Sequence, residues 1–253
     1  MRGLVLVLAL ALLAAPARAE SIVAGLSQAE IAITADFAGE EILVFGAIRR
    51  EAPLPEGGAA QIIVTVEGPP AQVTVRRKSR NFGIWVNNEA VVIDRAPSFY
   101  AVAATSPLAE ILSETDDLRH QITIPRAIRA VGITSEASDA PAFLDAMIRI
   151  RVADGDYARD EAGVDFAQQT LFRADFILPA NLIEGEYRVR LFLTRDGRVV
   201  DALEEVIEVQ KAGLERWIFN LSRQQPLVYG LLSLVLAALA GWGASEVFRR
   251  LRL

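Results

Sequence analysis

The sequence predicts a mainly β protein: an immunoglobulin-like sandwich, in one or two β portions with a helical insertion, followed by one C-terminal transmembrane helix. Three observations support this prediction. Apolar and polar residues alternate with a period of two in short segments that are separated by turn-forming residues. A stretch in the middle of the chain has helical spacing, and a long uncharged apolar run lies near its end.

The composition shows where the apolar residues are concentrated. The 253 residues are 52% hydrophobic and 23% charged, which is too apolar for an ordinary soluble domain and too charged for a protein with many spans. Residues 1–19 and 226–248 account for the excess. The chain has no Cys, and its one His is His120, which excludes a cysteine nucleophile, a disulfide and a thiolate metal site.

Residues 1–19 have the pattern of a secretory signal peptide. Arg2 precedes the apolar run Leu4–Ala15, and Ala17-Arg18-Ala19 is a small-x-small cleavage sequence. We expect cleavage after Ala19. The alternative is an uncleaved N-terminal anchor, for which the apolar run is short.

Residues 20–105 form the predicted N-terminal β portion. Alternation predicts half-buried strands within 31–35, 42–47 and 62–67. Further short strands are expected at 73–77, 83–86, 90–93 and 99–104. Turn formers separate these strands, among them Asn87-Asn88 and Ala96-Pro97.

Residues 106–165 form a predicted mixed helical insertion, with helices expected at 107–113 and 140–152. Residues 166–212 return to strands as a C-terminal β portion. Within it, Arg195-Asp196-Gly197-Arg198 predicts a tight hairpin, because Gly readily takes the positive φ that such turns require.

The last forty residues predict a membrane anchor. Apolar residues at helical spacing within 213–225 indicate a juxtamembrane amphipathic helix. Residues 226–248 contain one charge, Glu246 at their end, and are long enough to cross a bilayer as a helix. The arginines of the tail 249–253 predict a cytoplasmic C-terminus. We therefore expect a single-pass protein of the bacterial inner (cytoplasmic) membrane with its N-terminal domain in the periplasm.

Small residues recur every three or four positions in this span. One interpretation is a face that packs against another helix; the other is the ordinary abundance of Ala and Gly in bacterial spans. The packing candidates are Gly230, Ser233, Ala237, Gly241 and Ala244.

The most distinctive polar segment is 76–87, where four cations fall within five residues and aromatic residues follow. In an extended strand Arg77 would point away from Arg76, Lys78 and Arg80, so that three cations share one face. Such a face could bind an anion or an acidic partner, or it could only protect a solvated edge strand from unwanted pairing. The candidate partner- or anion-binding residues are Arg76, Arg77, Lys78, Arg80, Trp85, Asn87 and Tyr100.

Several blocks carry a family resemblance, in the same order and over nearly the whole mature chain. They are 76–78 with 83–87, 97–102, 171–174 with 178–179, 195–197, and 226–231 with 241–242. The chain resembles the alphaproteobacterial transmembrane protein family of unknown function. Members are often found beside sulfite-exporter-like permeases, so the resemblance implies a permease as the class of partner. It assigns no catalytic residue.

Enzymatic chemistry has little support in the sequence. Asp116-Asp117, Asp154-x-Asp156 and Asp160-Glu161 lack a recognisable partner group at fixed spacing, and we predict no catalytic residue, metal site or cofactor. A hydrolase using these acidic loops is the least favoured reading. Residues 20–212 carry 19 Lys and Arg against 30 Asp and Glu, a net charge of −11, which argues against nucleic acid as a partner.

We therefore expect a non-enzymatic accessory subunit of a membrane complex, with an integral membrane partner that resembles an anion (sulfite-type) permease. The alternative is a free-standing envelope module that binds a peptide, a glycan or a periplasmic protein. A homo-oligomer is compatible with either reading.

Overall fold

The computed structural model describes residues 20–34, 37–51, 58–130, 139–211 and 221–251. The predicted signal segment and residues 213–220 of the predicted juxtamembrane helix lie outside the described residues. The chain divides into two compact units, the second of which contains the C-terminal helix. Each unit is described by itself.

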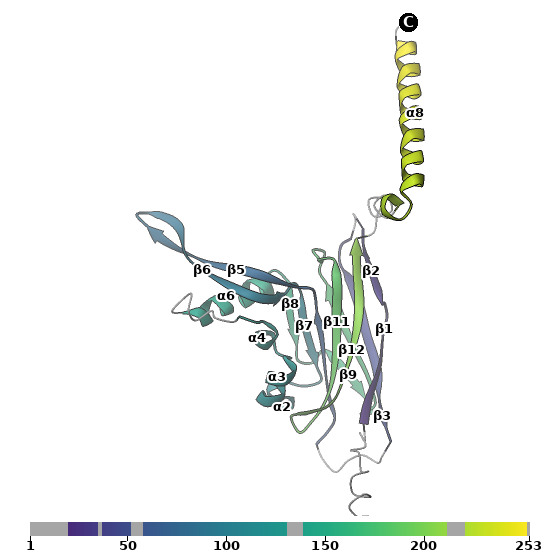
Figure 1. The fold of residues 1–253 in the computed structure, drawn as a ribbon. Coiled ribbons are helices and arrows are strands. Elements are labelled where there is room, and N and C mark those ends of the chain that lie inside the picture. Colours follow the sequence, from purple (N-terminus) through teal and green to yellow (C-terminus); the bar gives the residue numbers. More distant parts are fainter. Residues whose placement is uncertain (1–19, 35–36, 52–57, 131–138, 212–220, 252–253) are drawn as a thin grey trace, which may run out of the picture. The chain divides into compact units, whose positions relative to one another are not determined.

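Two antiparallel sheets form the sandwich of the first unit (Figure 1). The four-stranded sheet has the order β1 (Glu20–Leu26), β3 (Glu40–Arg50), β10 (Leu171–Leu178), β9 (Val164–Ala167). The six-stranded sheet has the order β2 (Glu30–Ile33), β12 (Arg198–Lys211), β11 (Gly185–Arg195), β4 (Gln61–Glu67), β7 (Tyr100–Ala104), β8 (Tyr157–Asp160). Its last pair, β7 with β8, is parallel. The predicted mainly β architecture is confirmed.

The two β portions are parts of one sandwich. β3 of the N-terminal portion pairs with β10 of the C-terminal portion, and β4 pairs with β11 in the other sheet. The insertion also contributes a strand, because β8 lies at the edge of the six-stranded sheet. Neither portion therefore contains a complete sheet of the sandwich.

The core between the sheets follows from the period of two. Every second residue of β10 is buried: Phe172, Ala174, Phe176 and Leu178. On β11 the alternating residues are buried as well, as their alternation predicts: Tyr187, Val189, Leu191 and Leu193. Across the gap, the backbone N–H of Ile22 on β1 donates to Asp201 Oδ2 on β12 at 2.9 Å.

The six-stranded sheet is covered on its other face as well. A second apolar cluster there joins Ile63, Tyr100 and Phe192 of the sheet to residues of three helices. These are α2 (Leu108–Ile111), α4 (Ile124–Ala127) and α6 (Ala140–Ala153), while α3 (Glu114–His120) contributes no residue to the cluster. The prediction that 62–67 is half-buried is therefore wrong: Ile62 to Glu67 are all buried, because helices replace solvent on the second face.

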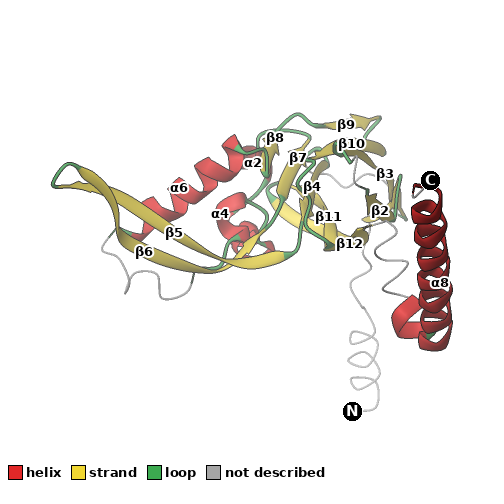
Figure 2. Cartoon of the chain, turned by 90° about the horizontal axis from the view of Figure 1, so that it is seen from above, coloured by secondary structure: helices red, strands yellow, loops and turns green. Residues whose placement is uncertain are grey.

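β5 (Pro70–Asn81) and β6 (Ile84–Pro97) form one long antiparallel hairpin instead of the several short strands predicted. The expected turn at Asn87-Asn88 is wrong. The chain reverses at Phe82-Gly83, and Asn88 lies at a bulge between the pairs Arg77↔Glu89 and Lys78↔Asn87. Figures 1 and 2 show the hairpin extending away from the sandwich, with α6 alongside its inner half.

The helix α8 (Pro226–Leu251) belongs to the second unit. Its segment Pro226–Ser245 is long and apolar enough to cross a membrane. This agrees with the predicted transmembrane helix at 226–248.

Glu20 joins the two sheets through a pair of arginines, and its charge gives a testable pH dependence. Its carboxylate accepts from Arg50 Nε at 2.8 Å and from Arg195 Nη2 at 2.9 Å. Burial raises the pKa of this carboxyl, but the hydrogen bonds and charges of Arg50 and Arg195 outweigh burial and hold the pKa below its usual value of 4.5.

Because the folded pKa is lowered, the charged carboxylate stabilises the fold above about pH 4.5, and this contribution is lost as the pH falls through the lowered pKa. We expect Glu20→Gln to lower the free energy of unfolding by about 2 kcal/mol at pH 7. Urea unfolding at pH 7 and pH 3.5 checks this, since the difference between wild type and variant should shrink at the lower pH. A constant difference would contradict the assignment.

Candidate functional site

The β5–β6 hairpin contains most of the predicted binding residues. Its strands pair from Pro70↔Pro97 to Asn81↔Ile84, and a two-residue turn joins them. Directly paired residues of an antiparallel ladder lie on the same face, so the register assigns each side chain to one of two faces.

The inner face of the hairpin is the face turned toward the helices. Val73 and Val75 pack against the helical apolar cluster. Arg77 follows on this face, where its guanidinium lies 4.5 Å from the centroid of the Phe143 ring on α6. The same guanidinium pairs with Glu89 at 3.3 Å and Asp139 at 3.0 Å. Arg77 thus fastens the hairpin to α6, and its charge is neutralised.

The opposite face, which we call the basic face, consists of Arg76, Lys78, Arg80, Trp85 and Asn87. The pairs Lys78↔Asn87 and Arg80↔Trp85 place these side chains next to one another. Within the described parts of the chain, no ion pair or hydrogen bond is found for the side chains of Arg76, Lys78 and Arg80. A domain with an excess of acidic residues therefore presents three uncompensated cations beside an indole that is 68% exposed.

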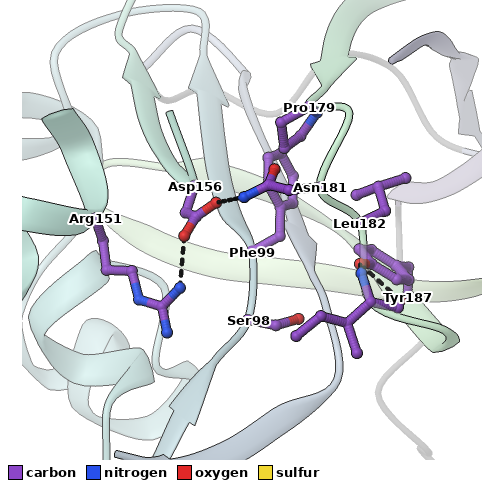
Figure 3. A pocket seen from close by; sticks show the side chains of 9 residues that line it. Ser98, Phe99, Arg151, Asp156, Pro179, Asn181, Leu182 and Tyr187 are labelled. Atoms are coloured by element: carbon purple, nitrogen blue, oxygen red, sulfur yellow. Dashed lines mark hydrogen bonds and ion pairs between the residues drawn. The ribbon is translucent and has the colours of Figure 1, made fainter. Parts of the chain in front are cut away.

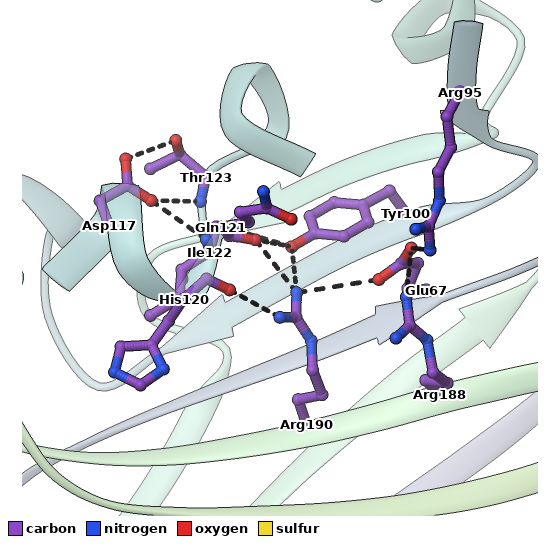
Figure 4. Close-up of polar contacts among 10 residues, drawn as sticks. All are labelled: Glu67, Arg95, Tyr100, Asp117, His120, Gln121, Ile122, Thr123, Arg188 and Arg190. Carbon is purple, nitrogen blue, oxygen red and sulfur yellow. Dashed lines mark hydrogen bonds and ion pairs between the residues drawn. The ribbon is translucent and has the colours of Figure 1, made fainter. Parts of the chain in front are cut away.

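Tyr100 does not belong to this surface, so its inclusion among the candidate binding residues is wrong. It lies on β7, is fully buried, and donates its hydroxyl to the Ile122 carbonyl at 2.8 Å (Figure 4). Burial, with a smaller contribution from Glu67, raises its pKa to about 12. Tyr100 faces the helices because β7 has apolar neighbours on both sides, which alternation by itself does not reveal.

Figure 4 also shows a charged cluster that the sequence analysis missed. The Glu67 side chain is 6% exposed and lies near three guanidiniums: Arg188 at 2.8 Å, Arg95 at 3.5 Å and Arg190 at 3.8 Å. Arg190 also donates to the carbonyls of His120 and Gln121, at 2.6 Å and 3.0 Å, and so closes the end of α3. The cluster joins sheet to helix. A signal was available, since a lone Glu at the end of an apolar strand needs a cationic partner.

Asp116 and Asp117, two of the carboxylates considered for catalysis, hold backbone in place. Asp116 accepts from the Val199 N–H at 3.1 Å and pairs with Arg119 at 3.0 Å. Asp117 accepts from the N–H groups of Ile122 and Thr123, at 3.1 Å and 2.8 Å. Among the residues that the structure describes, no group of three His, Asp or Glu side chains is placed to hold a metal ion.

His120 lies against an aromatic ring. Its imidazole is 5.6 Å from the ring centroid of Phe192, edge to face. Burial lowers its pKa, and the charges of Arg119 and Arg190 act in the same direction, while Asp116 opposes them. The neutral form is therefore favoured, as suits a side chain packed on the sheet.

A small pocket lies on the first unit, and Ser98, directly after β6, is among its lining residues (Figure 3). Asp156 lies at its wall, where it pairs with Arg151 and accepts from Asn181 Nδ2 at 3.1 Å. Phe99, Leu182 and Tyr187 provide apolar walls. Arg151, Asp156 and Asn181 bond to one another, whereas the buried Ser98 hydroxyl in the same lining has no hydrogen-bond partner among the described residues.

The small residues of α8 keep their predicted arrangement. Gly230, Ser233, Ala237, Gly241 and Ala244 lie on one helix, and Ser233 Oγ donates to the Tyr229 carbonyl at 2.9 Å. The structure holds a single chain, so packing of this face against another helix stays a prediction.

A family model described as "putative transmembrane protein" (Alph_Pro_TM) matches residues 21–250. The chain belongs to this family. The match covers the sandwich, the hairpin and nearly all of α8, and it confirms the resemblance seen in the sequence.

Curated proteins and solved structures give no indication of function beyond the family. No curated protein matches the chain. Among solved structures, the chain is similar to Spo0M, the sporulation control protein of Bacillus subtilis, with 12% identity and a TM-score of 0.26. The likeness covers 77% of this chain and 50% of that one, so the chain spans half the length of Spo0M. A likeness this low supports no inference about this family member.

Proposed function

We propose that this protein is a non-enzymatic accessory subunit of a membrane complex in the bacterial inner membrane, with its β sandwich in the periplasm. The family and the apolar helix α8 support the membrane anchor. The arginines that follow the span favour a cytoplasmic C-terminus and hence an exported sandwich. Among the carboxylates that a hydrolase would use, Asp116, Asp117 and Asp156 are engaged in ion pairs or backbone hydrogen bonds.

The observation that carries the proposal is the basic face of the hairpin. The hairpin extends beyond the sandwich (Figure 1). Its residues Arg76, Lys78 and Arg80 have no carboxylate partner among the described residues. Protection of an edge strand would account for the cations alone. It would not account for the length of the hairpin or for its attachment to α6 through Arg77. Three cations on a projecting arm fit a partner protein with an acidic surface.

The family resemblance suggests the class of partner, a permease for a small anion of the sulfite type. Such a permease would lie in the same membrane as α8. The hairpin would then contact it through the basic face, and the small residues of α8 would pack against its helices.

Purification of the tagged full chain in mild detergent tests the proposal. We expect one membrane protein to copurify in constant stoichiometry and to be identified as a permease by mass spectrometry. Recovery of an isolated monomer, or of a fraction bound to peptidoglycan, would overturn the accessory-subunit reading and favour the free-standing envelope module.

Charge reversal of the basic face should disrupt that complex. We expect Arg76→Glu, Lys78→Glu and Arg80→Glu together to weaken the complex by about a hundredfold, because three attractive contacts become repulsive. The matched control reverses three exposed arginines elsewhere, Arg49, Arg149 and Arg198, and should leave the complex intact. Equal losses from both sets would show that net charge alone matters. An unchanged complex in the first variant would show that the basic face is only solvated.

A further inference from the structure

The tip of the β5–β6 hairpin, residues Asn81-Phe82-Gly83-Ile84-Trp85, combines two features that the fold does not explain. The first is exposure of large apolar side chains. Phe82 is completely exposed at 110%, Ile84 is 65% exposed and Trp85 is 68% exposed. Burying such side chains is the main driving force of folding, so three of them together at the end of an arm mark a surface that binds something apolar.

The second feature is the backbone of the turn. Phe82 has φ 49° and Gly83 has φ 89°, so both central residues of the turn are in the positive-φ region of a type I′ turn. Asn, Asp and Gly suit the first of these positions, whereas a bulky side chain there is strained.

Another turn of this protein has the same backbone conformation and a residue that suits it. At the β11–β12 turn, Asp196 has φ 51° and Gly197 has φ 76°, nearly the same backbone with Asp in the first position. Asp196 also accepts a hydrogen bond from the Gly58 N–H at 3.1 Å. The space around Gly83 in the hairpin tip is open, since a Cβ added there would meet nothing within 4 Å. Folding alone would therefore favour Asn or Asp at position 82.

We infer that this tip inserts into the interface of the lipid bilayer that α8 spans. The arrangement of the apolar side chains favours lipid over a protein surface. Pairing places Ile84 with Asn81 on the inner face and Trp85 with Arg80 on the basic face, while Phe82 occupies the turn itself. Apolar groups on both faces and at the end need an apolar surrounding on all sides, which a bilayer provides and a flat docking surface does not.

The residues behind the tip suit such an insertion. Trp is enriched at membrane interfaces, and long cationic side chains keep their charges in the headgroup layer while their stems lie along apolar surface. At the usual rise of a strand, Arg80 lies about 7 Å behind Phe82, within the depth of about 5–10 Å that an interfacial element reaches, and Lys78 lies about 13 Å behind, beyond that depth.

A single tip binds lipid weakly, and the anchor compensates for this. α8 keeps the domain beside a bilayer, so insertion of the tip is an intramolecular event at high effective concentration. The inference rests on the apolar side chains of the tip and requires no protein partner. It can therefore hold or fail independently of the proposed accessory role.

The absence of Cys makes a direct test simple. Ile84→Cys is labelled with the environment-sensitive fluorophore NBD in the full chain, which is reconstituted without any partner into nanodiscs of phosphatidylcholine or of phosphatidylcholine with phosphatidylglycerol. Nitroxide groups on the acyl chains report insertion by quenching. We expect quenching at position 84 in both lipid compositions, and none at the control label Thr115→Cys on α3.

The matched variant is Phe82→Asn, which removes the apolar side chain and suits the turn. We expect it to reduce the inserted population about tenfold or more. Its melting temperature should equal or exceed that of wild type, which excludes misfolding as the cause. Absence of quenching in the labelled Ile84→Cys chain with Phe82 intact would overturn the inference, as would undiminished quenching when Phe82→Asn is added.

A third measurement separates lipid from protein as the occupant. If the label is unquenched in nanodiscs and becomes protected from a soluble quencher only in the purified complex, the tip binds the partner protein and the lipid inference fails. In that case the accessory-subunit proposal stands. If no partner copurifies but the label is quenched by lipid, the tip inference stands and the accessory proposal fails.

Discussion

Replacing Glu67 by Gln should lower the free energy of unfolding by about 3 kcal/mol, because three guanidiniums then lose the carboxylate of Glu67 as a partner. The side chain of Glu67 is 6% exposed, and that of Arg190, which lies 3.8 Å away, is 15% exposed. Arg95 and Arg188 are more exposed and recover part of their hydration, which places the effect at the lower end of the range for broken buried ion pairs.

Urea unfolding of the full chain, followed by circular dichroism, measures this change. The control is Glu89→Gln, which breaks the pair with Arg77 at the exposed hairpin and should cost less than about 1 kcal/mol. Similar losses for the two variants would mean that the Glu67 cluster contributes no more than a surface pair.

Gly46→Ala should be comparably destabilising, at about 3 kcal/mol, because the methyl group has no room. A Cβ at Gly46 would lie 2.4 Å from the Val23 carbonyl oxygen and 2.5 Å from Phe172 Cζ. The first contact is with backbone of the paired strand β1, so relief requires β1 and β3 to separate. A buried ring on β10 blocks the other direction.

Gly25→Ala on the neighbouring strand is the natural comparison. Its added Cβ would meet the Phe45 ring at 3.3 Å, and that ring is exposed and free to turn. We expect a change within about 0.5 kcal/mol, since the methyl also reduces the entropy of the unfolded chain. Thermal unfolding of both variants under the same conditions decides the point, and equal stability of Gly46→Ala and wild type would refute the packing argument.

The sequence predicted those features that depend on neighbours in the chain. The alternation of Tyr187, Val189, Leu191 and Leu193 gave the buried face of β11, and Asp196-Gly197 gave its turn. The Phe82-Gly83 turn was missed, since Phe is a poor turn residue and Asn87-Asn88 nearby is a better one. The residue preference of tight turns therefore failed at Phe82, which we assign to lipid binding. At this position the preference of the turn and the requirement of the function differ.

The burial of Tyr100 and Glu67 shows that alternation does not reveal whether one or both faces of a strand are covered. Their strands β4 and β7 are almost continuously apolar, which is typical of strands covered on both faces, yet alternation within 62–67 also fits a half-buried strand. The covering helices follow β7 along the chain, and only the tertiary contacts show that they fold back over this sheet. Alternation therefore placed the strands but could not say how many layers cover them.

For this protein, the sequence by itself determined the transmembrane span, the strand periodicity and the parity that separates Arg77 from Arg76, Lys78 and Arg80. Each of these follows from hydropathy or geometry over a few adjacent residues. The tertiary structure decided that the two β portions share their sheets, and that Arg77 is neutralised by Asp139, 62 residues away. It also decided that Phe82 stands exposed at the end of a fastened arm. These depend on contacts between distant segments, whose energies are not encoded in any local pattern.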